Sequence, residues 1–255
     1  MVIISSKDND IIKHIKKLSE KKYREEFGEY VIEGKKIVEE AIENGADIER
    51  IVVSESFIRV NNMKDVTIVT DKVFESMSGL VNSEGVLAVI RNKKLDEENI
   101  DLSHDFYLIL NDIQDPGNLG TIIRTADSLN IKQILVTDKT VDAYNPKVVR
   151  STMGAIFRVK IITINDIKKT IEKLKENGIK VYTTDLNTEN TIYSISFDKA
   201  AVVIGNEANG VSEEVKNMCD SRFIIPMLGK TESLNAAVAT GVVLYEAFRN
   251  KLMNK

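Results

Sequence analysis

The run Phe106–Leu110, FYLIL, constrains the fold strongly, because a strand without polar residues must be buried on both faces. Further apolar runs follow it, and each is separated from the next by a stretch with helical periodicity. This alternation predicts an α/β domain with a mostly parallel sheet that helices cover on both faces. The predicted strands are 106–110, 133–136, 159–162, 179–183 and 201–204, and the predicted helices lie within 111–131, 145–157 and 166–177.

The first part of the chain shows the same alternation on a smaller scale. We expect strands at 30–32, 51–53, 66–69 and 86–90, and helices at 5–20, 35–44, around Phe57 and at 72–77. Ser6 or Asp8 is the expected N-cap of the first helix, and Gly45 the stop after the second. The polar stretch NKKLDEENIDLSHD then predicts a linker at 93–105, between a small α/β domain at 1–92 and the larger domain at 106–255.

The composition describes an ordinary globular protein, with 43% hydrophobic and 29% charged residues among 255. The single cysteine, Cys219, excludes an intrachain disulfide, and we interpret it as a small hydrophobic residue on a helix. No cluster has metal-ligand spacing, so we expect no metal. The first residues do not resemble a secretory signal, and no stretch is long enough for a membrane span, which favours the cytoplasm.

The charge distribution leaves the question of nucleic-acid binding open. A net charge of −4 is unfavourable for a nucleic-acid-binding protein. However, one window holds six cations opposed only by Glu20, namely Lys13, Lys16, Lys17, Lys21, Lys22 and Arg24. It is either the solvated face of a helix or a surface that faces phosphates.

Glycine, asparagine and charged residues gather in three loops of the second domain, at 111–120, 205–210 and 226–235. Each follows an apolar strand, and loops at the carboxyl ends of parallel strands converge on one edge of the sheet. The loops therefore predict one pocket, with Arg124 and Glu207 as its ionic members. In the first loop Asn118 is the expected helix cap. The third loop leads, with Ser233 as the expected N-cap, into a helix whose apolar residues recur at Leu234, Val238, Val242 and Tyr245.

Several common chemistries do not fit these loops. Gly229–Thr231 spells GKT, but a phosphate-binding loop needs a glycine where Ile224 stands. The loop GNEANG lacks the dehydrogenase spacing G-x-G-x-x-G, and no histidine after His104 could serve a serine hydrolase. The remaining polar groups suit a ligand with an adenine, a ribose and a charged tail that backbone contacts hold.

The three loops closely resemble, in order, the motifs of the SpoU/TrmH-type methyltransferases of the SPOUT superfamily. The matching segments are NDIQDPGNLGTIIRTA at 111–126, IGNEANGV at 204–211 and IPMLGKTESLNAAVA at 225–239, with NPKVVRSTMGAIF at 145–157 between the first two. In the first domain, KKYREEFGEYVIEGKKIVEEAI and GVLAV resemble the substrate-binding domain that often precedes them. The segment Asn82–Glu84 departs from the family, whose members often carry a proline-containing turn there.

This resemblance implies S-adenosylmethionine as methyl donor and a ribose 2′-hydroxyl of structured RNA as acceptor. It also implies a homodimer and a C-terminal trefoil knot that forms the cofactor pocket. The expected target is ribosomal RNA, with transfer RNA second. A base methyltransferase of the same fold and an RNA-binding or assembly protein without catalysis are the alternatives. The serine and asparagine of Ser233-Leu234-Asn235 and the arginine of Arg124-Thr125-Ala126 favour methylation of a ribose over methylation of a base.

The resemblance also implies which residues form the site. The implied catalytic residues are Asn111, Arg124, Glu207, Ser233 and Asn235, with Arg124 meeting the pocket of the other subunit. The implied cofactor-binding residues are Thr183, Thr184, Leu186, Ile204, Gly205, Asn206, Glu207, Ile225, Met227, Ser233, Leu234 and Asn235. Arginine is often given the role of base in this family, but a guanidinium stays protonated in proteins. We therefore expect Arg124 to pair with a phosphate and to stabilise charge developing on the 2′-oxygen.

Overall fold

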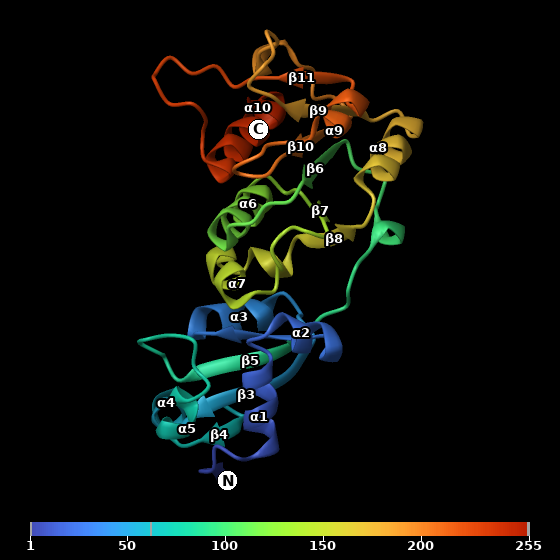
Figure 1. The fold of residues 1–255 in the computed structure, drawn as a ribbon. Helices are drawn as coiled ribbons and strands as arrows, with labels where there is room; N and C mark the ends of the chain where they lie inside the picture. The colour runs from blue at the N-terminus through green and yellow to red at the C-terminus, as the bar shows by residue number, and fades with distance from the viewer. Residues whose placement is uncertain (1, 62, 254–255) are drawn as a thin grey trace. The chain divides into compact units, whose positions relative to one another are not determined.

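The computed structural model describes residues 2–61 and 63–253, and the chain divides into two compact units (Figure 1). Unit 1 comprises Met1–Lys93 and Tyr144–Phe157, and unit 2 comprises Lys94–Ala143 and Arg158–Lys255. The predicted linker is not featureless, because a 3-10 helix at Glu97–Asn99 is capped by Asp96 and is followed by the buried Ile100. The predicted domain boundaries stay a prediction.

The described strands of unit 1 form one five-stranded sheet in the order β1-β4-β3-β5-β2. Strands β1, β4 and β3 run parallel, and β5 is antiparallel to both β3 and β2. The strands are β1 Ile3–Ile4, β2 Glu29–Glu33, β3 Ile48–Ser54, β4 Thr67–Val69 and β5 Val86–Arg91. The helices are α1 Asp10–Lys17, α2 Lys21–Phe27, α3 Lys35–Glu43, α4 Glu55–Asn61, α5 Asp71–Glu75, α7 Pro146–Thr152 and the 3-10 helix Ala155–Phe157.

Helices pack on both faces of this sheet. Successive buried residues of β3 and β5 therefore belong alternately to one core and to the other. Ile12 and Ile15 of α1 pack in one core with Leu87 of β5. Val38 of α3 packs with Ala88 in the core on the other face. Both faces of the sheet are therefore covered.

The sequence misplaced several features of unit 1. Strand β1 and helix α2 were not predicted. The N-cap of α1 is Asn9 rather than Ser6 or Asp8, because the Asn9 side chain accepts from the backbone N–H of Ile11 at 2.9 Å. Gly45 does end α3, with a φ of +65° that suits glycine.

The described strands of unit 2 form a six-stranded sheet in the order β11-β9-β10-β6-β7-β8, and every pair is parallel. This confirms the predicted parallel sheet, whereas the knot stays a prediction. The strands are β6 Phe106–Leu110, β7 Gln133–Thr137, β8 Lys160–Ile164, β9 Lys180–Thr184, β10 Ala200–Ile204 and β11 Ser221–Phe223. The helices are α6 Pro116–Ser128, α8 Ile167–Glu176, α9 Glu213–Met218, α10 Ala236–Met253 and the 3-10 helix Ile192–Ser194.

Strand β6 shows how both faces of this sheet are filled. Its residues are all buried, as the run FYLIL predicts. Tyr107 and Ile109 pack in the core with Leu174 of α8, whereas the ring of Phe106 lies 5.4 Å from that of Phe248 on α10. Because successive side chains of a strand point to opposite faces, α8 and α10 cover opposite sides of the sheet.

The two helices that carry motif residues begin at other caps than predicted. Pro116 is the first residue of α6, and Asp115 rather than Asn118 is its N-cap. Helix α10 begins at Ala236, after Asn235, whose side chain accepts from the backbone N–H groups of Ala237 and Val238 at 2.9 and 3.3 Å. Ser233 is therefore not the cap. The bounds of helix α9 and strand β11 were not predicted, although a helix was expected to carry Cys219 and a strand to precede the third loop. Cys219 is the C-cap of α9 and lies just outside the helix.

The apolar stripe of α10 does not lie in the core of the chain. Val238, Val242 and Tyr245 are 54%, 39% and 53% exposed, while Val243 and Leu244 are fully buried. A helix of mixed composition can therefore be apolar on two faces and bury only one of them within the chain. Within the described residues, no helix is both long and apolar enough to cross a membrane.

Candidate functional site

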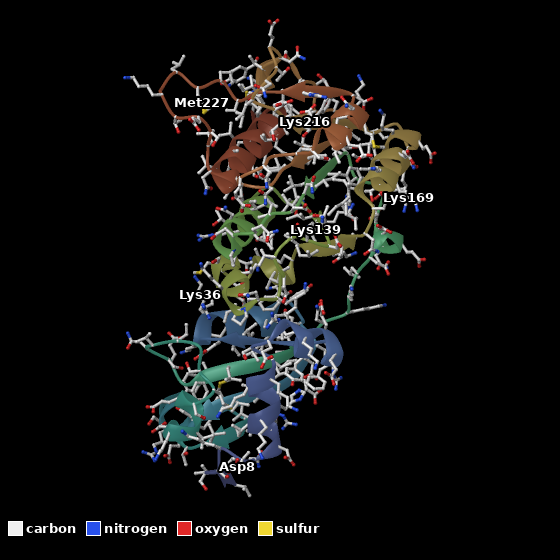
Figure 2. All side chains as sticks on the ribbon, in the orientation of Figure 1. Asp8, Lys36, Lys139, Lys169, Lys216 and Met227 are labelled. Carbon is white, nitrogen blue, oxygen red and sulfur yellow. The ribbon has the colours of Figure 1, made fainter. Side chains whose placement is uncertain are left out.

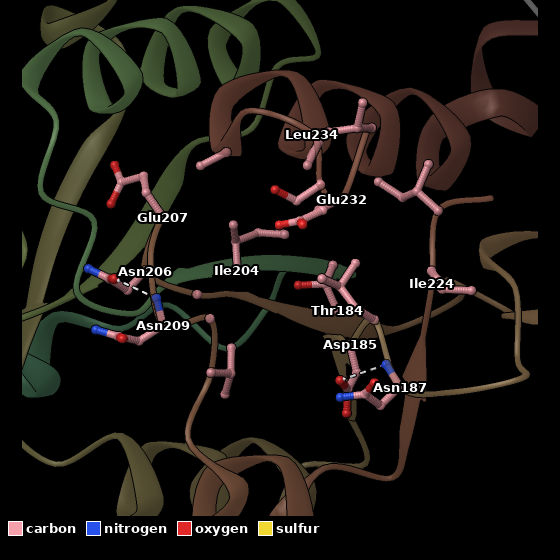
Figure 3. Close-up of a pocket in the computed structure, with 18 of the residues that line it drawn as sticks. Thr184, Asp185, Asn187, Ile204, Asn206, Glu207, Asn209, Ile224, Glu232 and Leu234 are labelled. Carbon is pink, nitrogen blue, oxygen red and sulfur yellow. Dashed lines mark hydrogen bonds between the residues drawn. The ribbon is translucent and has the colours of Figure 1, made fainter. Parts of the chain in front are cut away.

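The carboxyl ends of four neighbouring strands bring the predicted loops together. The strand order β11-β9-β10-β6 places the loops after these strands side by side on one edge of the sheet. The loops after β9, β10 and β11 and the start of α10 enclose a cavity of about 390 Å³ (Figure 3), whereas the predicted loop after β6 does not line it. Its lining includes Thr184, Asp185, Leu186, Asn187, Ile204, Gly205, Asn206, Glu207, Asn209, Val211, Lys216, Phe223, Ile225, Met227, Glu232, Ser233, Leu234 and Ala236.

Gly205, directly after β10, lets two backbone segments meet at the cavity. A Cβ on Gly205 would lie 2.3 Å from the carbonyl carbon of Gly210 and 2.5 Å from the nitrogen of Val211. The backbone of Asn206 and Gly210 is also paired by hydrogen bonds of 3.1 and 2.9 Å. The loop thus closes on itself, and a glycine is required where it does so.

The Asn206 side chain braces this loop. Its Nδ2 donates to the backbone carbonyl of Asp112 at 2.8 Å, which ties the second motif to the first. Its Oδ1 accepts from the backbone N–H groups of Ala208 and Asn209 at 2.9 and 3.0 Å, and Figure 3 marks the second of these bonds. The side chain that was predicted to stand near the cofactor therefore also shapes the loop.

A chain of hydrogen bonds joins all three motifs, and we call its members Glu207, Asn118 and Asn235 the clasp. Nδ2 of Asn118 donates to Oε1 of Glu207 at 3.0 Å, and Nδ2 of Asn235 donates to Oδ1 of Asn118 at 2.9 Å. Asn118 is buried at the start of α6. Asn118 was not predicted as a site residue, because an asparagine near a helix start is most simply interpreted as a cap.

The carboxylate of Glu207 is held in its charged form. Burial alone would raise its pKa, but hydrogen bonds from Asn118 and from the backbone N–H groups of Gln114 and Asp115 outweigh that effect. The pKa of Glu207 is therefore lower than usual. A carboxylate that already accepts these hydrogen bonds is a weak base, and its geometry suits the positioning of the first motif loop.

An ionic cluster that the sequence analysis missed lies at the other end of the cavity. Asp185, only 3% exposed in its side chain, lies 3.0 Å from Nζ of Lys216 and 3.2 Å from Nη1 of Arg222. Burial opposes its charge, but the N–H of Asn187 and the neighbouring cations keep the pKa of Asp185 below its usual range. Lys216 lies on α9 (Figure 2), whose bounds were not predicted from the sequence, so its approach to Asp185 was not predicted either.

The predicted site residues divide into two sets. Those that line the cavity are Thr184, Leu186, Ile204, Gly205, Asn206, Glu207, Ile225, Met227, Ser233 and Leu234. Those outside the lining are Thr183, Asn235, Asn111 and Arg124. Thr183 is fully buried and donates to the carbonyl of Val203 at 3.3 Å, and Asn235 belongs to the clasp.

Arg124 and Asn111 differ from the clasp residues. Arg124 lies exposed on α6, and within residues 2–61 and 63–253 its guanidinium has no hydrogen bond or ion pair. Asn111 is held by its backbone, whose N–H donates to the carbonyl of Ile204 at 2.8 Å. Cys219 is no candidate nucleophile, because burial raises the pKa of its thiol to about 12.

Comparison with known proteins gives the same family over nearly the whole chain. The model of the SpoU rRNA Methylase family matches residues 105–245, and that of the MRM3-like substrate binding domain matches residues 9–88. The 23S rRNA (guanosine(2553)-2′-O)-methyltransferase RlmP of Bacillus subtilis is 30% identical over 246 residues, which cover 95% of this chain and 97% of that protein. A putative TrmH family tRNA/rRNA methyltransferase of Staphylococcus aureus is 33% identical over 87% of this chain and 96% of its own. Among solved structures, the AdoMet-bound rRNA methyltransferase from Sinorhizobium meliloti superposes with a TM-score of 0.87, at 30% identity and 98% coverage of both chains.

Proposed function

Because this chain belongs to the SpoU rRNA methylase family, we propose that it transfers a methyl group from S-adenosylmethionine to a ribose 2′-hydroxyl of ribosomal RNA. The observation that carries the proposal is the cavity that the second and third motif loops of that family line, to which hydrogen bonds of Asn206 and Glu207 tie the first motif loop. A relative at 30% identity is named a ribose methyltransferase of 23S rRNA, and a solved relative at 30% identity contains the same methyl donor. The proposed substrate implies a cytoplasmic enzyme.

The residues of the cavity fit S-adenosylmethionine. About 390 Å³ is within the usual range for small-molecule pockets. Ile204, Ile225 and Leu234 supply apolar surface for the adenine, and Gly205 also belongs to the lining. Asp185, Asn187 and Lys216 supply polar groups at the other end for the ribose and the methionine part. When bound, the cofactor would supply a methyl group on a sulfonium, whose carbon an oxygen nucleophile can attack in line while the neutral thioether leaves.

The clasp is proposed to position the reactants. Glu207 fixes the first motif loop, and Asn118 connects that loop to Asn235 at the start of α10. Ser233 lines the cavity and lies two residues before Asn235, so the clasp also fixes the position of Ser233. Correct positioning of two reactants can supply a large part of the rate enhancement in a displacement reaction.

Arg124 is proposed to contact the RNA. Its guanidinium stays protonated, so it cannot remove the proton of the 2′-hydroxyl. Because it is exposed and has no ion pair within the described residues, it is available to a phosphate and to charge developing on the 2′-oxygen. Asn111, at the end of β6, is the remaining predicted catalytic residue and is proposed to lie near the substrate.

The division of labour between the parts of the chain is also a proposal. Residues 1–92 would bind RNA, 93–105 would link, and 106–255 would hold the methyl donor and the reacting ribose. The match of residues 9–88 to a substrate binding domain and of 105–245 to the methylase family supports this division.

We propose a homodimer and a C-terminal knot for the second part. The exposed apolar stripe of Val238, Val242 and Tyr245 on α10 supports the dimer, because a solvated helix rarely carries such a stripe without a partner. The knot is supported by hydrogen bonds between the chain after β11 and two segments that lie earlier in the sequence. Ile224 pairs through its backbone with Asn190 and Ile192, and Asn235 then bonds to Asn118. Light scattering of the wild type and of Val242→Glu tests the dimer, which the charge should dissociate.

Two measurements on the purified protein test the function. Calorimetric titration should show micromolar binding of S-adenosylmethionine and no binding of NAD. Labelled methyl groups from the donor should then appear in unmodified ribosomal RNA, and transfer RNA serves as the competing substrate. Label in transfer RNA alone would change the target, and binding without transfer to either RNA would support an RNA-binding protein without catalysis.

A further inference from the structure

A row of aromatic rings crosses the corner between α1 and α2. The ring of His14 lies 4.7 Å from that of Phe27, and Phe27 stacks on Tyr23 at 5.9 Å with an interplanar angle of 13°. All of these rings are partly exposed. The row ends at Tyr23, whose ring has Nζ of Lys17 and Nζ of Lys22 each 5.4 Å from its centroid.

The cations around this row are mostly without acidic partners. Within residues 2–61 and 63–253, no carboxylate pairs with Lys16, Lys17 or Lys22. Lys13 and Lys21 lie 3.7 Å from Asp8 and Glu25, in exposed pairs that contribute little. Residues 10–27 hold six Lys and Arg residues against four Asp and Glu residues, an excess of two positive charges in a chain whose net charge is −4.

The corner is held in a fixed shape by a buried arginine. Arg24, 7% exposed, donates through Nη1 to the backbone carbonyls of Leu18 and Ser19 at 2.8 and 2.7 Å. These bonds join α2 to the end of α1, so the ring and the lysines are presented from rigid elements. An open hollow of about 550 Å³ lies along α1, lined by Asp10, Lys13, His14, Lys16 and Lys17.

We propose that this corner binds an unpaired nucleotide of the RNA, with Tyr23 stacking on its base and Lys16, Lys17 and Lys22 contacting the adjoining phosphates. The proposal rests on the proposed function and extends it to a second RNA contact, on α1 and α2 of unit 1. Proteins bind unpaired nucleotides by combining cations that follow the backbone with an aromatic ring that stacks on a base. A duplex would not use an exposed ring in this way, because its bases are already stacked.

The ring is tested by filter binding of the full-length protein to ribosomal RNA transcribed in vitro. Loss of one stacked base should weaken binding roughly tenfold in Tyr23→Ala. Tyr23→Phe keeps the ring and should bind within about twofold of the wild type. Equal thermal stability of the variants would show that the loss does not reflect unfolding.

The lysines are tested by the salt dependence of binding. If Lys17 and Lys22 each contact a phosphate, the slope of log Kd against log salt concentration should fall by about 1.4 in the double variant Lys17→Ala/Lys22→Ala. The matched control is Lys64→Ala/Lys72→Ala, which removes two exposed lysines from another part of unit 1. It should leave both the affinity and the slope unchanged.

The outcomes separate this surface from the function. Calorimetry should give the same affinity for S-adenosylmethionine in all variants, because none touches the cavity. A wild type that methylates RNA, with Tyr23 and lysine variants that bind RNA equally well and with the same slope, would refute the surface alone. A wild type that neither binds nor methylates RNA would refute the proposed function as well. Weakened binding to ribosomal particles with unchanged binding to naked RNA would show a protein contact and would also overturn the proposal.

Discussion

Replacing Gly205 with alanine tests how the cavity is built, because one methyl group would collide with backbone on the opposite side of its loop. The added Cβ would lie 2.3 Å from the Gly210 carbonyl carbon, 2.5 Å from the Val211 nitrogen and 2.6 Å from the Gly210 oxygen. Ordinary contacts of a Cβ begin near 3.4 Å, so the loop must move by about an ångström. The neighbours are backbone atoms, which cannot rotate away as a side chain can.

The magnitude follows from this displacement. Overpacking of this kind costs about 1–3 kcal/mol of unfolding free energy, which corresponds to several degrees in Tm for a chain of this size. The moved segment, residues 205–211, contributes to the cavity lining, and a misplacement of about 1 Å can cost on the order of a hundredfold in function. We therefore expect Gly205→Ala to bind S-adenosylmethionine at least about tenfold more weakly by calorimetry.

Two other glycines of the motif loops are matched controls. At Gly229 an added Cβ would meet nothing within 4 Å, so Gly229→Ala should behave as the wild type. Gly210 also has open space but a φ of +64°, so Gly210→Ala should lose about 1 kcal/mol through backbone strain without a collision. If Gly205→Ala kept both the wild-type Tm and the wild-type affinity, the account of the cavity would be wrong.

Asn118→Ala breaks the clasp, so it should lower the unfolding free energy measured in urea by about 2 kcal/mol and should also reduce methyl transfer. Asn111→Ala is the control and should leave the unfolding free energy nearly unchanged. Equal losses of stability in both variants would contradict the role of the clasp. Because the pKa of Glu207 is lowered on folding, its stabilising effect is complete above the ordinary value of 4.5 and is lost as the pH falls through the folded pKa. Glu207→Gln should thus flatten the acid side of the Tm profile, and an unchanged profile would show that the carboxylate has no such effect. Arg124→Lys should reduce kcat on the order of a hundredfold with unchanged affinity for S-adenosylmethionine, and near-normal activity with an unchanged pH profile would exclude the proposed bidentate role.

The sequence predicted the sheet of unit 2 because β6 and β10 are apolar throughout and other apolar runs alternate with helical periodicity. Runs such as Phe106–Leu110 can lie only in a doubly covered sheet, and the structure confirms this. It also predicted that the polar loops after these strands meet in one pocket, since parallel strands end on the same edge. The second and third loops do line one cavity, but the first loop and Arg124 lie outside its lining.

What the sequence did not predict depends on contacts between distant segments. Strand β11, Ser221–Phe223, is too short to show a periodicity in the sequence. Because it pairs with β9, Arg222 lies close enough to Asp185 to form an ion pair. Asp115 caps α6 where Asn118 was expected, and Asn235 caps α10 where Ser233 was expected, because several residues near each helix start could serve as a cap. Packing between distant segments decides which residue caps each helix and which residues form the clasp.

The identity of the methylated nucleoside tests the central claim most directly. Unmodified ribosomal RNA would be incubated with the purified protein and labelled S-adenosylmethionine, digested to nucleosides and analysed by mass spectrometry. We expect the label in a 2′-O-methylated nucleoside, and no such product with Arg124→Ala. Label in a methylated base, or no label in RNA under conditions where the donor binds, would contradict the account.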